Sequence, residues 1–328
     1  MASLLFMSDP FDKGDVTQAL EAGAEGLLVP AVAVDEAASL SRTPVESLDG
    51  VERVALQSKA DEERAAEALA AGGTVLLERG WEIIPVENLL AVGEGTLYAA
   101  CESAERARLA AEVLERGVDG VVLEGNVLDD LRAVREMLHA GALGVELLPA
   151  RVTAIKPSGM GHRVCVDTLS RLDRGAGLLT GNSSGFTFLV HGETESNPYV
   201  ASRPFRVNAG AVHAYVSLPG DRTKYLEELG AGDEVLVVGH DGATRPAVVG
   251  RSKVEQRPML LIEAEVLSDS GRAQGTVFLQ NAETIRLVRP GGEPVSVVSL
   301  KPGDEVLVRV DQAGRHFGRR VAEDIEEK

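Results

Sequence analysis

Polar side chains of several chemical kinds are concentrated between residues 159 and 215, beside short apolar runs and glycine-flanked turns. Histidines, carboxylates and arginines lie at close spacing there. A segment that served packing alone would have no use for so many polar groups. We therefore predict that a binding or catalytic site is assembled largely from this part of the chain.

Arg203 and Arg206 bracket a proline in the run RPFR. Two planar guanidinium groups on a rigid turn suit a carboxylate or a phosphate, which each can hold through two parallel hydrogen bonds. Ion pairs with the protein's own carboxylates are the alternative. The sequence leaves both interpretations open.

His191, Glu193 and Glu195 alternate along an expected strand, so all three side chains are predicted to point to one face. One imidazole and two carboxylates could bind a divalent ion such as Mg²⁺ or Mn²⁺. A solvated strand face is the competing interpretation.

Three further side chains could transfer protons or react as nucleophiles. His213, in the run VHAYV, is a candidate acid or base, although a hydrogen-bonded structural histidine fits equally well. Lys224 and Lys253 could form a Schiff base or act as general bases if they are desolvated. Ordinary surface lysines are the alternative for both.

The elements that position these residues differ between the two halves of the chain. Apolar, β-prone runs begin at a regular interval near Leu4, Leu27, Val54, Val75, Leu97, Val121 and Val145. Segments of helical period lie between most of them, clearest at 60–72, 102–117 and 127–141. Alternating strands and helices at this spacing predict an α/β domain over residues 1–145, built as a complete or incomplete (β/α) barrel around a parallel sheet.

Two acids end apolar runs of this first domain. Glu78 follows TVLL and Glu124 follows VVL, which places both at the carboxyl ends of predicted strands. Sites of parallel sheets are built at that edge. Loop carboxylates or helix caps are the alternative for each.

From about Leu143 onward the helical alternation stops, and short strands with Gly, Pro and Asp turns follow. We predict a β-rich second domain over residues 146–328. It contains an internal repeat, because LGAGDEVLVV (229–238) matches LKPGDEVLVR (300–309), followed by GRSKVE (250–255) and GRRVAE (318–323). A Gly-Asp turn that leads into an alternating strand is typical of hairpins and small barrels.

Composition excludes several classes of function. The net charge of −18 is unsuited to binding nucleic acid, whose phosphates need a basic surface. No apolar run approaches a membrane span, and Asp9 interrupts the N-terminal apolar stretch, so we expect a cytoplasmic protein. Cys101 and Cys165 are far apart and are expected to be reduced thiols.

Motifs over nearly the whole length resemble those of 3-dehydroquinate synthases of the second, non-classical type. The likeness is carried by RVCVDT (163–168), by 188–216, by TKYLEELGAGDEVLVV (223–238), by VGRSKVEQRPMLLIEAE (249–265), by LQNAETIRLV (279–288), by RHFG (315–318) and by WEIIPVENLLA (81–91). One departure is Leu169, where the family run usually has a second cysteine.

The resemblance implies a reaction on a seven-carbon 2-amino-6-oxo sugar acid. NAD-dependent oxidative deamination creates a ketone at carbon 2, and the carbon beside the other ketone then attacks it to close the ring. No GxGxxG fingerprint follows a strand in the first half, so NAD would have to bind in a non-standard way. A sister branch, 3-amino-4-hydroxybenzoate synthase, implies instead a non-redox, manganese-dependent cyclisation of a phosphorylated amino sugar.

These expectations assign roles to residues in the matched segments. We expect a small-molecule substrate as the partner, and neither nucleic acid nor a membrane. The sequence leaves open whether the protein forms a homo-oligomer. We expect one cleft that faces the carboxyl ends of the first-domain strands and has Glu78 or Glu124 on its opposite wall. The residues expected to converge on it are Arg203, Arg206, His191, Glu193, His213 and Lys224. The catalytic candidates are His213, Lys224, Lys253 and Asp167; the substrate-binding candidates are Arg203, Arg206, Asn208, Tyr199 and Glu78; the metal candidates are His191, Glu193 and Glu124.

Overall fold

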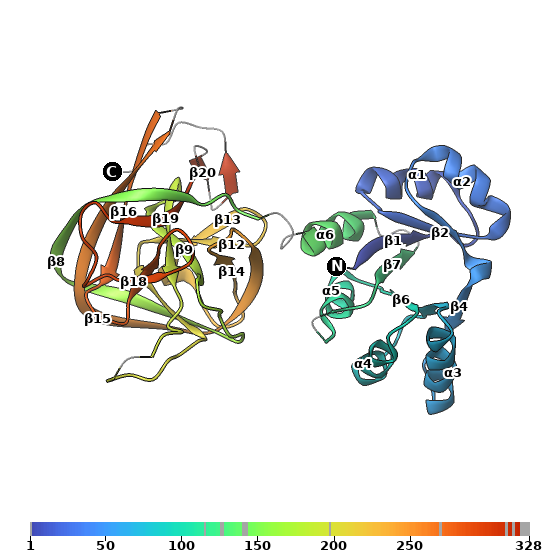
Figure 1. The fold of residues 1–328 in the computed structure, drawn as a ribbon. Helices are drawn as coiled ribbons and strands as arrows, with labels where there is room; N and C mark the ends of the chain where they lie inside the picture. The colour runs from blue at the N-terminus through green and yellow to red at the C-terminus, as the bar shows by residue number, and fades with distance from the viewer. Residues whose placement is uncertain are drawn as a thin grey trace. The chain divides into compact units, whose positions relative to one another are not determined.

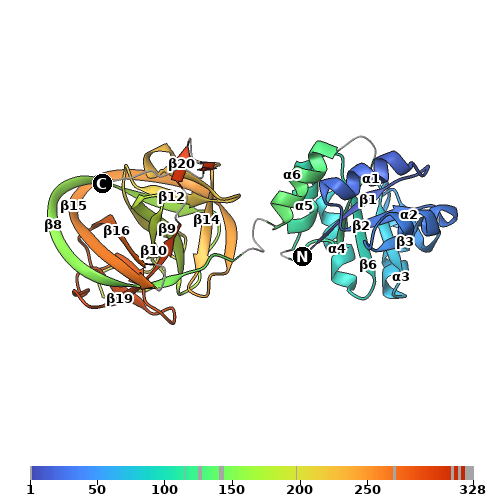
Figure 2. The same cartoon turned by 90° about the horizontal axis from the view of Figure 1, so that it is seen from above.

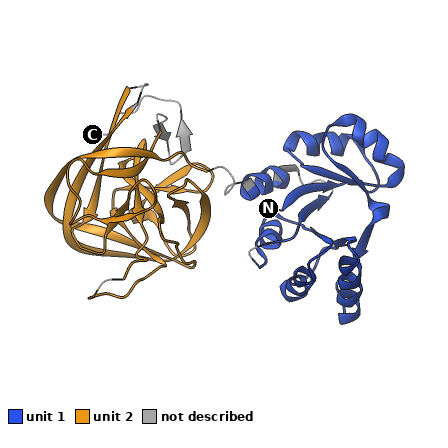
Figure 3. Ribbon diagram, in the orientation of Figure 1, with its two compact units in different colours: residues 1–139 blue, residues 140–328 orange. Residues whose placement is uncertain are grey.

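The computed structural model divides the chain into two compact units, Met1–His139 and Ala140–Lys328, whereas the sequence placed the boundary at residue 145 (Figure 3). None of the helices in the described part of the chain is long and apolar enough to cross a membrane. The structure describes residues 2–114, 116–124, 128–139, 144–196, 198–268, 271–311, 314–316 and 319–321.

The first unit is a seven-stranded, entirely parallel sheet with helices on its outer side (Figures 1 and 2). Its strands are β1 (Ser3–Met7), β2 (Gly26–Val29), β3 (Val45–Ser47), β4 (Val51–Val54), β5 (Thr74–Leu77), β6 (Thr96–Ala100) and β7 (Gly120–Glu124). The strands are hydrogen-bonded in the order β3-β2-β1-β7-β6-β5-β4, so β1 pairs with both β2 and β7. Consecutive strands are neighbours everywhere except between β3 and β4, where the ring is open. The sheet is therefore a nearly closed barrel, as predicted.

Among the described residues, five α-helices connect strands of this sheet and a sixth, α6, follows the last strand. They are α1 (Lys13–Ala22), α2 (Val34–Leu40), α3 (Lys59–Ala70), α4 (Ile83–Val92), α5 (Ala104–Glu112) and α6 (Leu128–His139). Local sequence signals set their starts: the side chains of Asp12, Ser58 and Ser103 each accept a backbone N–H in the first turn of α1, α3 and α5. Gly23, with φ of 99°, ends α1 in the left-handed region.

Alternating side chains of the strands supply two apolar layers. Leu4 and Phe6 of β1 join the cluster between sheet and helices, whereas Leu5 and Met7 join a smaller cluster on the opposite face of the sheet. The predicted helices over 60–72, 102–117 and 127–141 are present as α3, α5 and α6.

One predicted strand belongs to the other unit. The run near Val145 leads into a strand that begins at Leu148 and lies in the second unit, and the seventh strand of the first sheet is β3, which the sequence analysis did not predict. β3 has only three residues, too few to give a periodic signal.

The second unit is β-rich, as predicted, and all of its strand pairs are antiparallel. Six strands close a ring through successive pairs in the order β9-β10-β19-β8-β15-β14-β9. The strands of this unit are β8 (Leu148–Thr168), β9 (Ala176–Ser183), β10 (Phe186–His191), β11 (Arg206–Ala211), β12 (Tyr215–Leu218), β13 (Arg222–Tyr225), β14 (Glu234–Gly239), β15 (Thr244–Ser268), β16 (Gly271–Gln280), β17 (Arg286–Val288), β18 (Pro294–Ser296), β19 (Glu305–Val310), β20 (Gly314–His316) and β21 (Arg319–Val321).

The two copies of the repeat occupy equivalent positions in this ring. Gly232 and Gly303 both have positive φ, 92° and 97°, and lead into β14 and β19. The side chain of Asp233 accepts the N–H of Gly230, and that of Asp304 accepts the N–H of Lys301. β14 pairs with the long strand β15, and β19 pairs with the long strand β8. The run at 318–323 lies largely outside the described residues.

Candidate functional site

A polar face is formed by alternate residues of β8, β11 and β15. On β8, Val164 and Val166 are fully buried in the core, so Arg163, Cys165 and Asp167 point to the opposite face. Antiparallel pairing places residues of β11 and β15 directly opposite these side chains. The polar face consists of Arg163, Cys165 and Asp167 of β8, Arg206 and Asn208 of β11, and Arg251, Lys253, Glu255 and Arg257 of β15.

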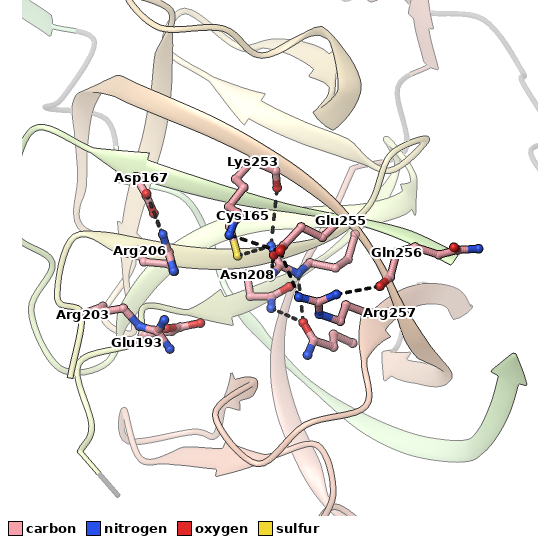
Figure 4. Close-up of polar contacts among 12 residues, drawn as sticks. Cys165, Asp167, Glu193, Arg203, Arg206, Asn208, Lys253, Glu255, Gln256 and Arg257 are labelled. Carbon is pink, nitrogen blue, oxygen red and sulfur yellow. Dashed lines mark hydrogen bonds and ion pairs between the residues drawn. The ribbon is translucent and has the colours of Figure 1, made fainter. Parts of the chain in front are cut away.

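Asp167 is the centre of one end of the polar face (Figure 4). Arg206 donates to both of its oxygens, from Nε to Oδ1 at 2.6 Å and from Nη2 to Oδ2 at 2.8 Å. Arg251 Nε donates to Oδ2 at 2.9 Å. Burial alone would raise the pKa of Asp167, but the hydrogen bonds from Arg206 and Arg251 outweigh burial and hold the pKa below its usual range. Asp167 is therefore a permanent carboxylate near neutral pH.

Arg163 is the centre of the other end. It is 7% exposed and donates from Nε to Gln280 Oε1 at 3.0 Å, while Nη1 lies 2.7 Å from Cys165 Sγ and Nη2 contacts Glu255. Asn208 donates to the same Gln280 oxygen at 2.8 Å. Burial raises the pKa of the Cys165 thiol to about 11, so this cysteine is protonated and not a ready nucleophile.

The charge of the polar face is opposite to that of the whole chain. Two carboxylates, Asp167 and Glu255, face five cationic side chains, Arg163, Arg206, Arg251, Lys253 and Arg257. The side chains of Arg251, Lys253 and Arg257 are 61%, 48% and 41% exposed and can reach solvent. A local excess of three positive charges in a chain of net charge −18 favours an anionic ligand here.

The two arginines predicted to clamp a ligand both bind the protein's own carboxylates. The fork of Arg206 is taken by Asp167, and Arg203 Nε lies 2.7 Å from Glu193 Oε2. Burial raises the pKa of Glu193, against the opposing effect of Arg203 and Arg206. Arg203 keeps a third of its side chain exposed, whereas Arg206 is almost fully buried.

The residues predicted to alternate on one strand face do not do so. β10 ends at His191, and beyond it Glu193 forms only an isolated bridge to Arg203. His191 Nε2 accepts the N–H of Gly175 at 2.9 Å, and Glu195 is paired with Arg174 at 3.2 Å. The predicted shared face is therefore wrong, because the strand stops before the acids begin.

Three other candidates lie elsewhere in the second unit. His213 is exposed and lies 3.2 Å from Asn182 Oδ1, between β11 and β12. Lys224 donates to Asp233 of the first repeat turn at 2.7 Å, so it holds that turn. Tyr199 is 95% exposed.

In the first unit, Glu78 and Glu124 lie where the sequence placed them, at the carboxyl ends of β5 and β7. Arg53 lies 3.0 Å from Asp9 and 3.5 Å from Glu78, and Arg79 lies 2.8 Å from Glu124. Two adjoining hollows of about 250 and 420 Å³, which share Arg79 and Glu124, open at this edge of the sheet. The predicted carboxyl-end position of these acids is confirmed.

Comparison with known proteins decides the family. Residues 8–138 match the N-terminal domain of 3-dehydroquinate synthase II, and residues 149–328 match its C-terminal domain. The chain belongs to the 3-dehydroquinate synthase II family. It is 45% identical to the 3-dehydroquinate synthase of Methanospirillum hungatei, over 97% of both chains. It is 48% identical to a 3-dehydroquinate synthase homolog of Aquifex aeolicus over 98% of both, and 49% identical to the Methanocaldococcus jannaschii synthase over 84% of this chain and 77% of that one.

The turn that holds a pyrophosphate in many dinucleotide-binding folds does not fit one in this member of the family. The turn after β1 lacks the glycine fingerprint, and the hollow beside it is lined by Asp9, Asp12, Asp15 and Glu124. Asp12 already caps α1 by accepting the N–H of Asp15. These carboxylates would repel a dinucleotide's phosphates at this helix terminus.

The metal candidates do not fit a shared ion either. His191 accepts the N–H of Gly175, Glu193 is paired with Arg203, and Glu124 is paired with Arg79. In the part of the chain that the structure describes, no three His, Cys, Asp or Glu side chains are grouped as metal ligands. We therefore assign no chemical step to a metal.

The sequence analysis missed four residues of the polar face, Arg163, Arg251, Glu255 and Arg257, and also Gln280 of β16, which accepts hydrogen bonds from it. The signal that could have identified most of them is alternation: RVCVDT and RSKVEQR each place polar residues at every second position. Their pairing across strands is set by register, which a single sequence does not display.

Proposed function

We propose that this protein is a 3-dehydroquinate synthase that converts a seven-carbon 2-amino-6-oxo sugar acid by oxidative deamination and ring closure. Relatives that carry the name 3-dehydroquinate synthase match over nearly the whole chain, which supports the reaction class. The observation that carries the assignment to a site is the cationic excess of the polar face. A sugar acid has one group that such a face recognises, its carboxylate.

The half-exposed cations of β15 are the proposed carboxylate-binding groups. Lys253 and Arg257 both contact Glu255, at 3.2 and 2.9 Å, and keep further donors for a ligand. Arg251 is held at Asp167 in the same row. This row of β15 carries three cations and one anion, Glu255. The substrate carboxylate would be the second anion beside these cations.

Asp167 and Arg206 act as positioning residues in this proposal. The Asp167 carboxylate stays ionised and holds Arg251 at the exposed end of the polar face. On its buried side, Asp167 accepts two hydrogen bonds from Arg206. Asp167 was a candidate catalytic residue from sequence. Its lowered pKa makes it unsuited to donating a proton near neutral pH.

The chemistry has two balanced halves. Deamination removes a hydride from carbon 2 and a proton from the ammonium group, and water then replaces the nitrogen to give the ketone and free ammonium. NAD would supply the hydride acceptor. Ring closure breaks a C–H bond beside the carbon-6 ketone, forms a C–C bond to carbon 2 and protonates the carbon-2 oxygen. Because the β1–α1 turn does not fit a pyrophosphate, we assign residues only to carboxylate binding and ring closure.

The experiment is a product assay with purified protein, the seven-carbon amino ketose and NAD. We expect NADH and 3-dehydroquinate in equal amounts, quantified by absorbance and by NMR. A parallel reaction contains the phosphorylated ketose with Mn²⁺ and no NAD. Formation of 3-amino-4-hydroxybenzoate in that reaction, with no 3-dehydroquinate in the first, would overturn the proposal in favour of the sister activity.

A further inference from the structure

Strand β16 connects the polar face with a second group of candidate residues. Val277 and Leu279 are fully buried in the core, so Thr276, Phe278 and Gln280 lie on the opposite face. Gln280 accepts hydrogen bonds from the polar face, as described above. The ring of His213 packs edge-on against Phe278, with centroids 5.7 Å apart, and Asn182 Nδ2 donates to Thr276 Oγ1 at 2.7 Å. Phe278 and Gln280 are one two-residue step apart, roughly 7 Å along the strand, so β16 links His213 to the polar face.

A hollow of about 520 Å³ opens beside His213. It is large enough for a small metabolite. Two phenols and two carboxylates line it together with the imidazole and an amide. The lining residues are Asn182, Val212, His213, Tyr215, Tyr225, Glu227 and Glu228.

In the structure, Asn182 turns its amide oxygen toward His213. Because Asn182 Nδ2 donates to Thr276, its Oδ1 is the atom that faces His213 Nε2, at 3.2 Å. An amide oxygen only accepts, so Nε2 carries the hydrogen. In the neutral ring the lone pair is then on Nδ1, the nitrogen that can take a proton.

The tyrosine pair supplies a hydrogen-bond donor in the same hollow. Tyr215 and Tyr225 lie with their ring centroids 4.7 Å apart and their hydroxyl oxygens 3.0 Å apart. With Tyr215 as the donor between them, the O–H of Tyr225 can be donated to a ligand. Glu228 accepts the backbone N–H of Tyr225 at 2.8 Å and so helps to fix its position.

We propose that His213 and Tyr225 are catalytic residues for the ring closure. His213 Nδ1 takes a proton from the carbon beside the carbon-6 ketone, the electron pair of that C–H bond moves into an enolate, and the Tyr225 hydroxyl donates a hydrogen bond to the enolate oxygen. Glu227 lines the same hollow and stabilises the imidazolium that forms. The identity of the substrate rests on the proposed function; the proton-transfer centre rests on this geometry.

Deuterium exchange tests the proton transfer without the redox step. The protein is incubated in D₂O with the seven-carbon amino ketose and no NAD. Loss of the protons on the carbon beside the carbon-6 ketone is followed by ¹H NMR against a protein-free blank. We expect catalysed exchange by the wild type. His213→Ala and His213→Gln should each lower its rate by about 10²–10⁴-fold, and Tyr225→Phe by about 10²-fold.

The matched control is His162→Ala, because His162 is also exposed but does not line the hollow. It should exchange at the wild-type rate. Exchange by His213→Ala at that rate, or no exchange by the wild type, would overturn the inference. A protein that exchanges these protons but forms no 3-dehydroquinate with NAD would retain the inference and lose the proposed function.

Discussion

Arg206 holds Asp167 in a two-point ion pair, although the two residues lie 39 positions apart in the chain. Both side chains are at most a tenth exposed, and β11 and β8 place them directly opposite each other. The two Arg206 nitrogens that the sequence analysis assigned to a ligand therefore bind Asp167. It leaves the more exposed cations of β15 as the groups that can bind substrate.

We predict that Asp167→Asn destabilises the second unit by about 3–5 kcal/mol, because it leaves Arg206 buried without its counter-ion. The measurement is hydrogen exchange of β8 and β15 peptides across a urea titration. Glu263→Gln is the control, since it breaks the mostly exposed pair with Lys156 and should cost less than about 1 kcal/mol. Equal costs for the two variants would show that the buried pair has no special role in stability.

Acid should destabilise the protein partly through His191. This side chain is 2% exposed, and burial lowers its pKa from 6.5 to about 4. The unfolded chain therefore binds a proton between about pH 6.5 and 4 that the folded chain does not, so stability is lost as pH falls through this window, by up to about 3 kcal/mol.

The check is the free energy of unfolding as a function of pH for the wild type and His191→Gln, which cannot be protonated. The variant should have the flatter profile between pH 6.5 and 4. Parallel profiles would mean that the pKa of His191 is the same in the folded and unfolded chains.

The repeat turns give a matched pair of substitutions. Among the described residues, a Cβ at Gly232 or Gly303 would meet no heavy atom within 4 Å, so alanine there costs only its unfavourable positive φ, about 1–2 kcal/mol each. Thermal unfolding should show similar, additive losses for the two variants. Gly230→Ala, in the same turn but without positive φ, should be nearly neutral. A large difference between the two repeat glycines would argue against equivalent turns.

Much of the fold was predictable because its signals are local. Helices such as α3 have a capping serine and an apolar period, and the Gly-Asp turns recur in the sequence itself. The site was harder to predict, because the partner of Arg206 depends on strand register. His191 and Glu193 looked like co-ligands only on the assumption that one strand continued through both, whereas β10 ends at His191. The link between His213 and the polar face runs through β16, which carries no chemical motif of its own.

The central claim is that the cations of β15 bind the substrate carboxylate, and steady-state kinetics of NADH formation tests it most directly. Lys253→Ala and Arg257→Ala should each raise KM by roughly 5- to 150-fold, equivalent to about 1–3 kcal/mol, with a smaller effect on kcat. Lys156→Ala, an exposed lysine on β8 outside the polar face, should leave both constants unchanged. Wild-type KM values for Lys253→Ala and Arg257→Ala would contradict the account.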